Sequence, residues 1–178
     1  MKAKILSLIV LCSILIWTPK VTAQAAPKDS ITVYIFLHES CRISQYYSLP
    51  LRKLHEQYAN EYLQFVGVFP SPNSTSEKIK AFKDAYNIPF TLEADHYHQR
   101  TEALGATVTP QVVVFNETDR DILYTGRIDD SYARVGQRKR VNTSSELKDV
   151  LEAIKNNTPI LSENAPAIGC FIGKNKLH

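Results

Sequence analysis

The sequence predicts one α/β domain built on a mixed β-sheet, and three observations lead to this fold class. Residues 31–37 and 63–69 are apolar runs rich in β-branched and aromatic side chains, as is typical of buried central strands. A helical pattern follows each run, so the order strand, helix, strand, helix predicts parallel pairing through right-handed crossovers. Residues 112–115 and 122–126 then predict an antiparallel hairpin around a polar turn.

Four helices are predicted around this sheet. Over residues 41–60, apolar side chains recur at steps of three and four, and Pro50 within this segment is expected to kink the helix. A second helix over 75–86 is expected to begin with Ser74 or Thr75 as its cap, and a short third helix to span 96–104. The last helix, over 144–157, has Ser144 as its expected N-cap.

The chain divides into four predicted segments. Residues 1–23 combine early lysines with a short apolar run and small residues near position 23, a pattern typical of a secretory signal peptide. Residues 24–30 are a linker, residues 31–157 form the domain, and residues 158–178 form a tail that carries Cys170. We therefore expect an exported protein, periplasmic or extracellular, with no stable membrane anchor after cleavage before Gln24.

The charge balance gives no indication of nucleic-acid binding. The whole sequence has 21 basic and 18 acidic residues, but Lys2, Lys4 and Lys20 belong to the predicted signal peptide. The remaining chain is formally neutral, whereas a nucleic-acid footprint requires a clustered positive face. Residues 136–140, GQRKR, are interpreted as a solvated loop.

Cys41 lies where the first predicted strand ends and the first helix begins. A thiolate at such a position is stabilised by unpaired backbone N–H groups and by the helix dipole, and Arg42 adds a positive charge. Ser44 occupies the place of the second cysteine of a CxxC motif, so it could donate a hydrogen bond to sulfur but could not resolve a mixed disulfide. Resolution would require Cys170 or an external thiol.

Two interpretations of Cys41 and Cys170 are open from the residues alone. In the first, they form a structural disulfide that joins the tail to the domain and adds about 4 kcal/mol of stability by the chain-entropy estimate. In the second, they form a redox pair in which Cys170, on a mobile tail after Gly169, approaches and leaves Cys41. Glycine permits the close backbone approach that either arrangement needs.

The order of these motifs resembles the thioredoxin fold over residues 31–157. The motifs are Cys41 at the first strand-to-helix junction, TVTP before the third strand, and a final helix after a hairpin. More narrowly, SCRIS, VGVFPSP, TVTPQVVVF, YTGRIDDSY and AIGCFI resemble exported redoxins of the alkyl hydroperoxide reductase/thiol-specific antioxidant superfamily. Arg42 and Gln111 stand where many of those proteins have Pro and Glu, and the segment FLHES lacks the Pro and Thr that precede a typical peroxidatic cysteine.

The resemblance implies a substrate groove beside Cys41. Pro110 would be a cis-proline that faces the cysteine, and Thr109 would present backbone polar groups to a bound substrate. Ser44 and Arg42 would complete this groove. The partners would be a protein or small-molecule thiol, disulfide or peroxide, together with an external thiol reductant.

We therefore predict an exported redoxin in which Cys41 is the nucleophile and Cys170 the candidate resolving cysteine, with no cofactor. One alternative is a copper-binding module that uses both cysteines with His38 or His96, because thiolate and imidazole suit Cu(I). The other is a non-catalytic interaction domain locked by a disulfide. Asp129 and Asp130 are interpreted as a turn or helix cap near which Arg127 forms an ion pair with one of them.

Overall fold

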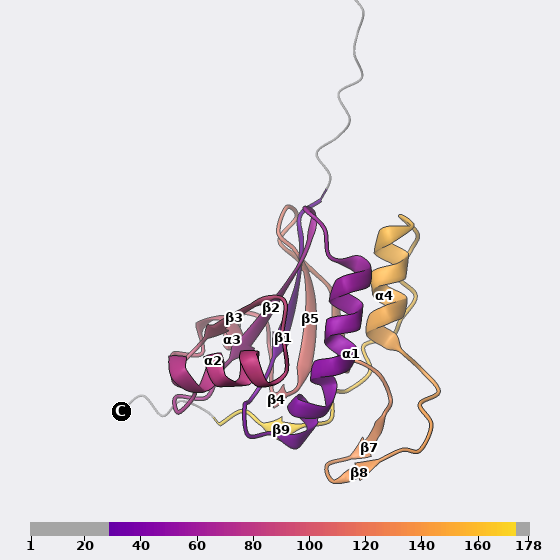
Figure 1. The fold of residues 1–178 in the computed structure, drawn as a ribbon. Helices are drawn as coiled ribbons and strands as arrows, with labels where there is room; N and C mark the ends of the chain where they lie inside the picture. The colour runs from indigo at the N-terminus through magenta and orange to yellow at the C-terminus, as the bar shows by residue number, and fades with distance from the viewer. Residues whose placement is uncertain (1–28, 174–178) are drawn as a thin grey trace, which may run out of the picture.

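A mixed five-stranded sheet forms the centre of the molecule, in the strand order β3-β2-β1-β5-β6 (Figure 1). The computed structural model describes residues 29–173, so the predicted signal peptide and most of the linker lie outside the described residues. The strands are β1 (Ile31–Phe36), β2 (Leu63–Phe69), β3 (Thr91–Ala94), β5 (Gln111–Asn116) and β6 (Asp121–Gly126). Strands β1, β2 and β3 pair in parallel, whereas β5 pairs antiparallel with both β1 and β6. The predicted α/β fold class is confirmed.

Helices cover both faces of this sheet. They are α1 (Arg42–Tyr58), α2 (Ser76–Ala85), α3 (Gln99–Ala103) and α4 (Glu146–Lys155). The chain moves in one direction from β1 to β2 to β3, so right-handed crossovers place α1 and α2 on the same face. After β3, the chain crosses back over the sheet to β5, and α3 in this connection lies on the opposite face. Helix α4 packs beside α1 and completes the first layer (Figure 1).

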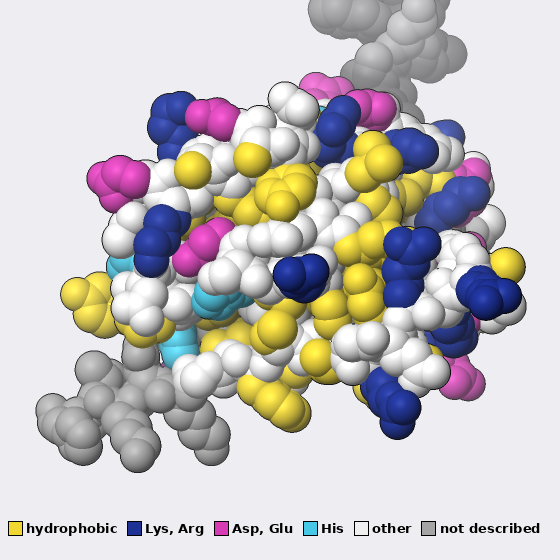
Figure 2. All heavy atoms as spheres, turned by 60° about the horizontal axis from the view of Figure 1, so that its bottom comes forward, with side chains coloured by type: hydrophobic (Ala, Val, Ile, Leu, Met, Phe, Trp, Pro, Cys, Tyr) yellow, Lys and Arg dark blue, Asp and Glu magenta, His cyan; other side chains and the backbone are white. Residues whose placement is uncertain are grey.

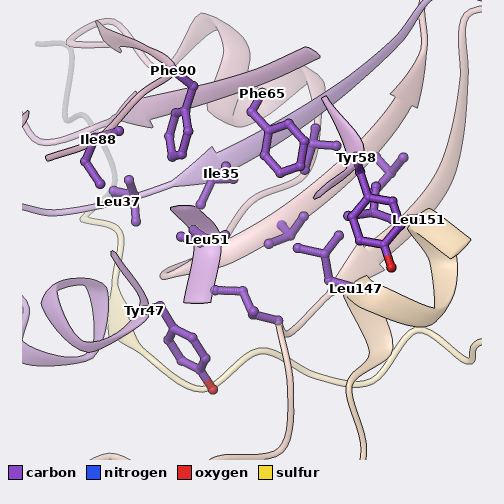
Figure 3. Packing of buried hydrophobic residues seen from close by; sticks show 14 of the residues in the cluster. Ile35, Leu37, Tyr47, Leu51, Tyr58, Phe65, Ile88, Phe90, Leu147 and Leu151 are labelled. Carbon is purple, nitrogen blue, oxygen red and sulfur yellow. The ribbon is translucent and has the colours of Figure 1, made fainter. Parts of the chain in front are cut away.

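The main hydrophobic core lies between the sheet and helices α1, α2 and α4 (Figure 3). Alternate residues of β1, such as Val33 and Ile35, point into this core, where they meet Leu51 of α1 and Leu147 of α4. The intervening residues, Tyr34 and Phe36, belong to a smaller cluster on the other face, with Leu104 at the end of α3. The first face therefore carries the larger core, and it includes Cys41.

The prediction differs from the structure at β3, which was missed, and at α3, which is shorter than expected. Strand β3 was missed because its four residues lie at the sheet edge without alternating burial. The predicted helix over 96–104 is only the five-residue α3, because His98 adopts a left-handed conformation with φ 56° and acts as its N-cap. Residues with this conformation cannot continue a right-handed helix.

The other helices agree more closely with the prediction. Helix α1 runs through Pro50, and Thr75 caps α2 by accepting a hydrogen bond from the Lys78 N–H. The predicted cap of α4 is wrong by one residue, since Ser145 occupies the N-cap position. The Ser144 hydroxyl instead donates to the Glu146 carboxylate at 2.8 Å. Among the described helices, none is long and apolar enough to cross a membrane.

Two short two-stranded sheets lie beyond the end of β1, near the start of α1 (Figure 1). One pairs β4 (Val108–Thr109) with β9 (Cys170–Phe171), and the other pairs β7 (Tyr132–Arg134) with β8 (Gln137–Arg138). Both pairs are antiparallel, and neither was predicted. The first joins segments distant in sequence, and the second is a local hairpin.

Candidate active site

Cys41 occupies the junction between β1 and α1. It is the N-cap of α1, with extended backbone angles of φ −78° and ψ 116°. Its N–H donates to the His38 carbonyl at 3.0 Å, and its own carbonyl accepts from the Gln45 N–H at 2.9 Å. These bonds close the turn after β1 and begin the helix, so the predicted location of Cys41 is confirmed.

The loop before β5 brings a cis-proline to Cys41. Phe36 at the end of β1 pairs with Gln111 at the start of β5, so the residues that precede β5 lie at the same sheet edge as the residues that follow β1. The Thr109–Pro110 peptide bond is cis, as predicted. The Cys41 sulfur lies 3.4 Å from the Thr109 carbonyl oxygen, to which the protonated thiol can donate.

The tail brings Cys170 to the same place. Cys170 pairs with Thr109 across the β4–β9 sheet, and the Ile172 N–H donates to the Thr107 carbonyl at 2.9 Å. The two sulfur atoms, of Cys41 and Cys170, lie 3.0 Å apart, and both residues are free thiols. The structure therefore places the two sulfur atoms in contact without a bond between them.

Backbone contacts dock the tail along the domain, so Cys170 lies against Cys41 in this conformation. The Arg127 N–H donates to the Ala165 carbonyl at 3.0 Å, just after the end of β6. Farther along the tail, Gly169 passes so close to β4 that a Cβ atom there would lie 2.2 Å from the Thr109 carbonyl oxygen. Only glycine fits at this crossing without a shift of the backbone.

The two cysteines differ in accessibility and in acidity. Burial raises the pKa of the Cys41 thiol, but a hydrogen bond from Cys170 and the nearby amides and hydroxyl at the helix start outweigh it, so the pKa is lowered. These amides, of Ile43 and Ser44, favour the thiolate although the sulfur makes no regular capping hydrogen bond. Cys170 is exposed as a residue, yet its sulfur faces Cys41. Desolvation there, with the hydrogen bond and negative charge of Cys41, raises the pKa of Cys170 to about 11.

Ser44 and Arg42, the other predicted groove residues, have different surroundings. Ser44 is fully buried, and its hydroxyl accepts a hydrogen bond from the His38 N–H at 3.3 Å, so it supports the turn as well as the sulfur. The Arg42 side chain is exposed beside the cysteine. A cavity of 220 Å³ opens next to the paired cysteines, with His38, Thr109 and Phe171 in its lining.

The histidines near this site bind carbonyl oxygens of the β2–α2 connection. His98 is buried, and its Nε2 lies 2.8 Å from the Pro70 carbonyl oxygen, while the His96 Nε2 lies 2.9 Å from that of Ser74. Over residues 29–173, no three His, Cys, Asp or Glu side chains are grouped as metal ligands. The geometry therefore gives the copper alternative no third ligand beside Cys41 and Cys170.

The segment 126–132 packs beside the site and lines a small cavity together with Pro110. The Tyr47 hydroxyl, from α1, donates to the Asp129 carboxylate at 2.6 Å. The expected pairing of Arg127 with a neighbouring aspartate is wrong: Arg127 pairs with Glu146, and Asp130 pairs with Lys139. Tyr47 was predicted only as an apolar position of the first helix, and Tyr46 was given no role, although both follow Cys41 by about one and a half helical turns.

Comparisons with known proteins establish the fold. No family model and no curated protein matches the chain. The chain is similar to the solved structure of an uncharacterized conserved protein from Geobacillus kaustophilus, with 23% identity, a TM-score of 0.73 and coverage of 85% of this chain and 81% of that one. A hypothetical protein from Sinorhizobium meliloti has 26% identity, a TM-score of 0.70 and coverage of 82% and 80%.

A more distant similarity supports the same fold. The structure of MTB DsbF in mixed oxidized and reduced forms has 18% identity and a TM-score of 0.51, with coverage of 70% of this chain and 81% of that one. Similarity at this level shows the fold alone. The described part of the chain has a thioredoxin-like fold, with a mixed central sheet and flanking helices.

Proposed function

We propose that this protein is an exported thiol-disulfide oxidoreductase that alternates between a Cys41/Cys170 dithiol and an intramolecular disulfide. The observation that carries the proposal is the 3.0 Å contact between the sulfur atoms of two free cysteines, of which Cys41 has a lowered pKa and Cys170 a raised pKa. A thiolate nucleophile with a protonated partner in bonding range is the arrangement that a dithiol reductant requires.

Reduction of the substrate disulfide involves only the two cysteines and the substrate. The Cys41 thiolate attacks one sulfur of a substrate disulfide, and the other substrate sulfur leaves as a thiolate that takes up a proton. Cys170 then loses its proton and attacks the Cys41 sulfur, which releases the second substrate thiol and leaves the Cys41–Cys170 disulfide. Two electrons pass to the substrate, and an external thiol reductant restores the dithiol.

Peroxide is the second substrate class, as in the superfamily that the motifs resemble. The Cys41 thiolate would attack a peroxide oxygen and form a sulfenic acid, with release of water or an alcohol. Cys170 would condense with that sulfenic acid to give the same disulfide and water. The low-pKa thiol supports both reactions, so the rates with a disulfide and with hydrogen peroxide must be compared directly.

Access to Cys41 requires movement of the tail. Cys41 is 4% exposed, because β9 lies against β4 over the sulfur. Strand β9 has only two residues, so its separation from β4 breaks few backbone hydrogen bonds. In this proposal, the tail leaves to admit the substrate and returns with Cys170 to resolve the mixed disulfide.

The test uses the predicted mature chain, Gln24 to His178, equilibrated at defined redox potentials, alkylated and weighed by intact mass. We expect a reversible Cys41–Cys170 disulfide with a potential above about −300 mV, the level typical of structural bridges. The Cys170→Ser variant should accumulate a mixed disulfide with a model disulfide, whereas Cys41→Ser should be inactive. A much lower potential would overturn the proposal in favour of a structural bridge.

A further inference from the structure

A basic hairpin projects beside the active site. We use this name for residues 132–141, which include β7, β8 and residues 139–141. It contains Arg134, Arg138, Lys139 and Arg140, and no acidic residue lies between 131 and 145. The four basic residues are exposed, as is Val135 at the turn, with 61% of its surface accessible. Because the predicted mature chain is formally neutral, this concentration of charge is local.

The basic hairpin is held in place from below by Asp130. This carboxylate is buried, accepts from the Lys139 ammonium at 2.6 Å and from the Thr143 N–H at 2.7 Å, and so fixes the segment that directly follows the second strand. The Lys139 N–H also donates to the Ser131 carbonyl at 2.7 Å. Residues 136–140 are exposed, as the interpretation of a solvated loop requires, but Gln137 and Arg138 form strand β8 of a hairpin rather than part of a loop.

The hairpin is attached directly to the helix that begins at Cys41. The Arg138 guanidinium lies 4.9 Å from the centre of the Tyr46 ring, and the Tyr46 and Tyr132 rings are 5.4 Å apart, edge to face. Tyr132 also lines a small cavity together with Pro110, the cis-proline of the site. The hairpin therefore forms one rim of the active site.

Part of the positive charge on this rim is free to bind a ligand. Lys139 is paired with Asp130, and Arg138 lies on Tyr46. By contrast, no carboxylate of the described residues forms an ion pair with Arg134, Arg140 or the neighbouring Arg42. Figure 2, which turns this end of the molecule forward, shows basic side chains gathered on the side where the hairpin lies.

We infer that the basic hairpin binds an acidic segment of a polypeptide substrate and holds it beside Cys41. This inference rests on the proposed function and specifies its substrate class. Arginine side chains pair with carboxylates through two parallel hydrogen bonds, and a local positive rim raises the association rate of acidic partners. The location against α1 and Pro110 favours a reacting polypeptide over an anionic membrane, which would not need to lie next to the sulfur.

The experiment uses two synthetic peptides of equal length, each with one cysteine in a mixed disulfide with 2-mercaptoethanol. In one peptide, Asp and Glu residues follow the cysteine, and in the other Asn and Gln replace them. The measurement is the second-order rate at which each peptide oxidises the reduced chain. We expect the acidic peptide to react about tenfold faster at low ionic strength, with a smaller ratio as salt is added.

The test variant is Arg134→Glu/Arg140→Glu, which should abolish or invert this preference while the neutral peptide reacts at the original rate. The matched control, Lys53→Glu/Lys155→Glu, makes the same change in net charge on α1 and at the far end of α4, and should keep the preference. Oxidation by the neutral peptide shows separately that the proposed function holds. Equal rates for both peptides would overturn the inference, and loss of binding to phosphatidylserine vesicles in the hairpin variant would then assign the hairpin to membranes.

Discussion

The two small sheets at the active-site end are alike in size but differ in how they are held. The β4–β9 pair is held by backbone hydrogen bonds between segments far apart in sequence, and it covers Cys41. The β7–β8 pair is a local hairpin in which side chains add to the backbone hydrogen bonds, above all the buried Asp130. A two-residue strand can separate and return, whereas a hairpin anchored on a buried carboxylate keeps its position. We conclude that the β4–β9 pair suits a resolving cysteine that moves, and that the β7–β8 hairpin suits a binding surface that keeps its position.

The largest effect should follow from removal of the hairpin's anchor. In Asp130→Asn, the ion pair with Lys139 is lost and the bonds from Thr143 and Ser144 are weakened, so we expect a loss of about 2–3 kcal/mol in the free energy of unfolding. Chemical denaturation measures this change in the free energy of unfolding. The rate of Cys41 alkylation in native buffer should change little, and a large increase would mean that the two sheets are coupled.

The same carboxylate gives a pH dependence with a defined sign. The hydrogen bonds from Lys139 and Thr143 hold the pKa of Asp130 well below its usual value of 3.8. Its contribution to stability is therefore complete above the unfolded-state pKa and is lost as the pH falls through the lower folded-state value. The unfolding free energy of the wild type should fall in acid more steeply than that of Asp130→Asn.

The next effect concerns the other sheet. In Gly169→Ala, the new methyl group would meet the Thr109 carbonyl oxygen, so β9 must shift away from β4. We expect alkylation of Cys41 to become about tenfold faster, because the closed state loses about 1.4 kcal/mol, while global stability changes little. Gly173→Ala, where a Cβ atom meets nothing within 4 Å, is the matched control. Unchanged alkylation in Gly169→Ala would show that the tail does not limit access.

A smaller effect should separate the acidities of the two cysteines. The ultraviolet absorbance of thiolate should report one group that titrates below the ordinary cysteine pKa of 9.0 and a second group with a pKa of about 11. Cys41→Ser should abolish the first step, and it should also lower the pKa of Cys170 because the neighbouring negative charge is gone. A single step near 9.0 in the wild type would contradict the assigned roles.

Local patterns in the sequence were sufficient for β1, β2, β5, β6, α1, α2 and the location of Cys41, because burial and helical periodicity are properties of neighbouring residues. The cis Thr109–Pro110 bond came from the resemblance of TVTP to known proteins. Strands β4 and β9 were missed because two-residue strands have no periodicity, and their pairing depends on contacts made only in the folded chain. Asp130 was misassigned for a similar reason: its partner Lys139 lies nine residues away, directly after a strand that the sequence did not indicate.

The smallest effect tests how the hairpin is held against α1. Arg138→Ala removes the contact of a guanidinium with the Tyr46 ring, which at an exposed site contributes about 0.5–1 kcal/mol. We expect a stability loss of this size, smaller than that of Asp130→Asn, and partial retention of the contact in Arg138→Lys. Because Arg138 lies on the hairpin and Tyr46 on the helix of Cys41, its loss should also reduce the preference for the acidic peptide. If the preference were unchanged, the free charges of Arg134 and Arg140 alone would account for it, and the hairpin would need no contact with α1 to orient them.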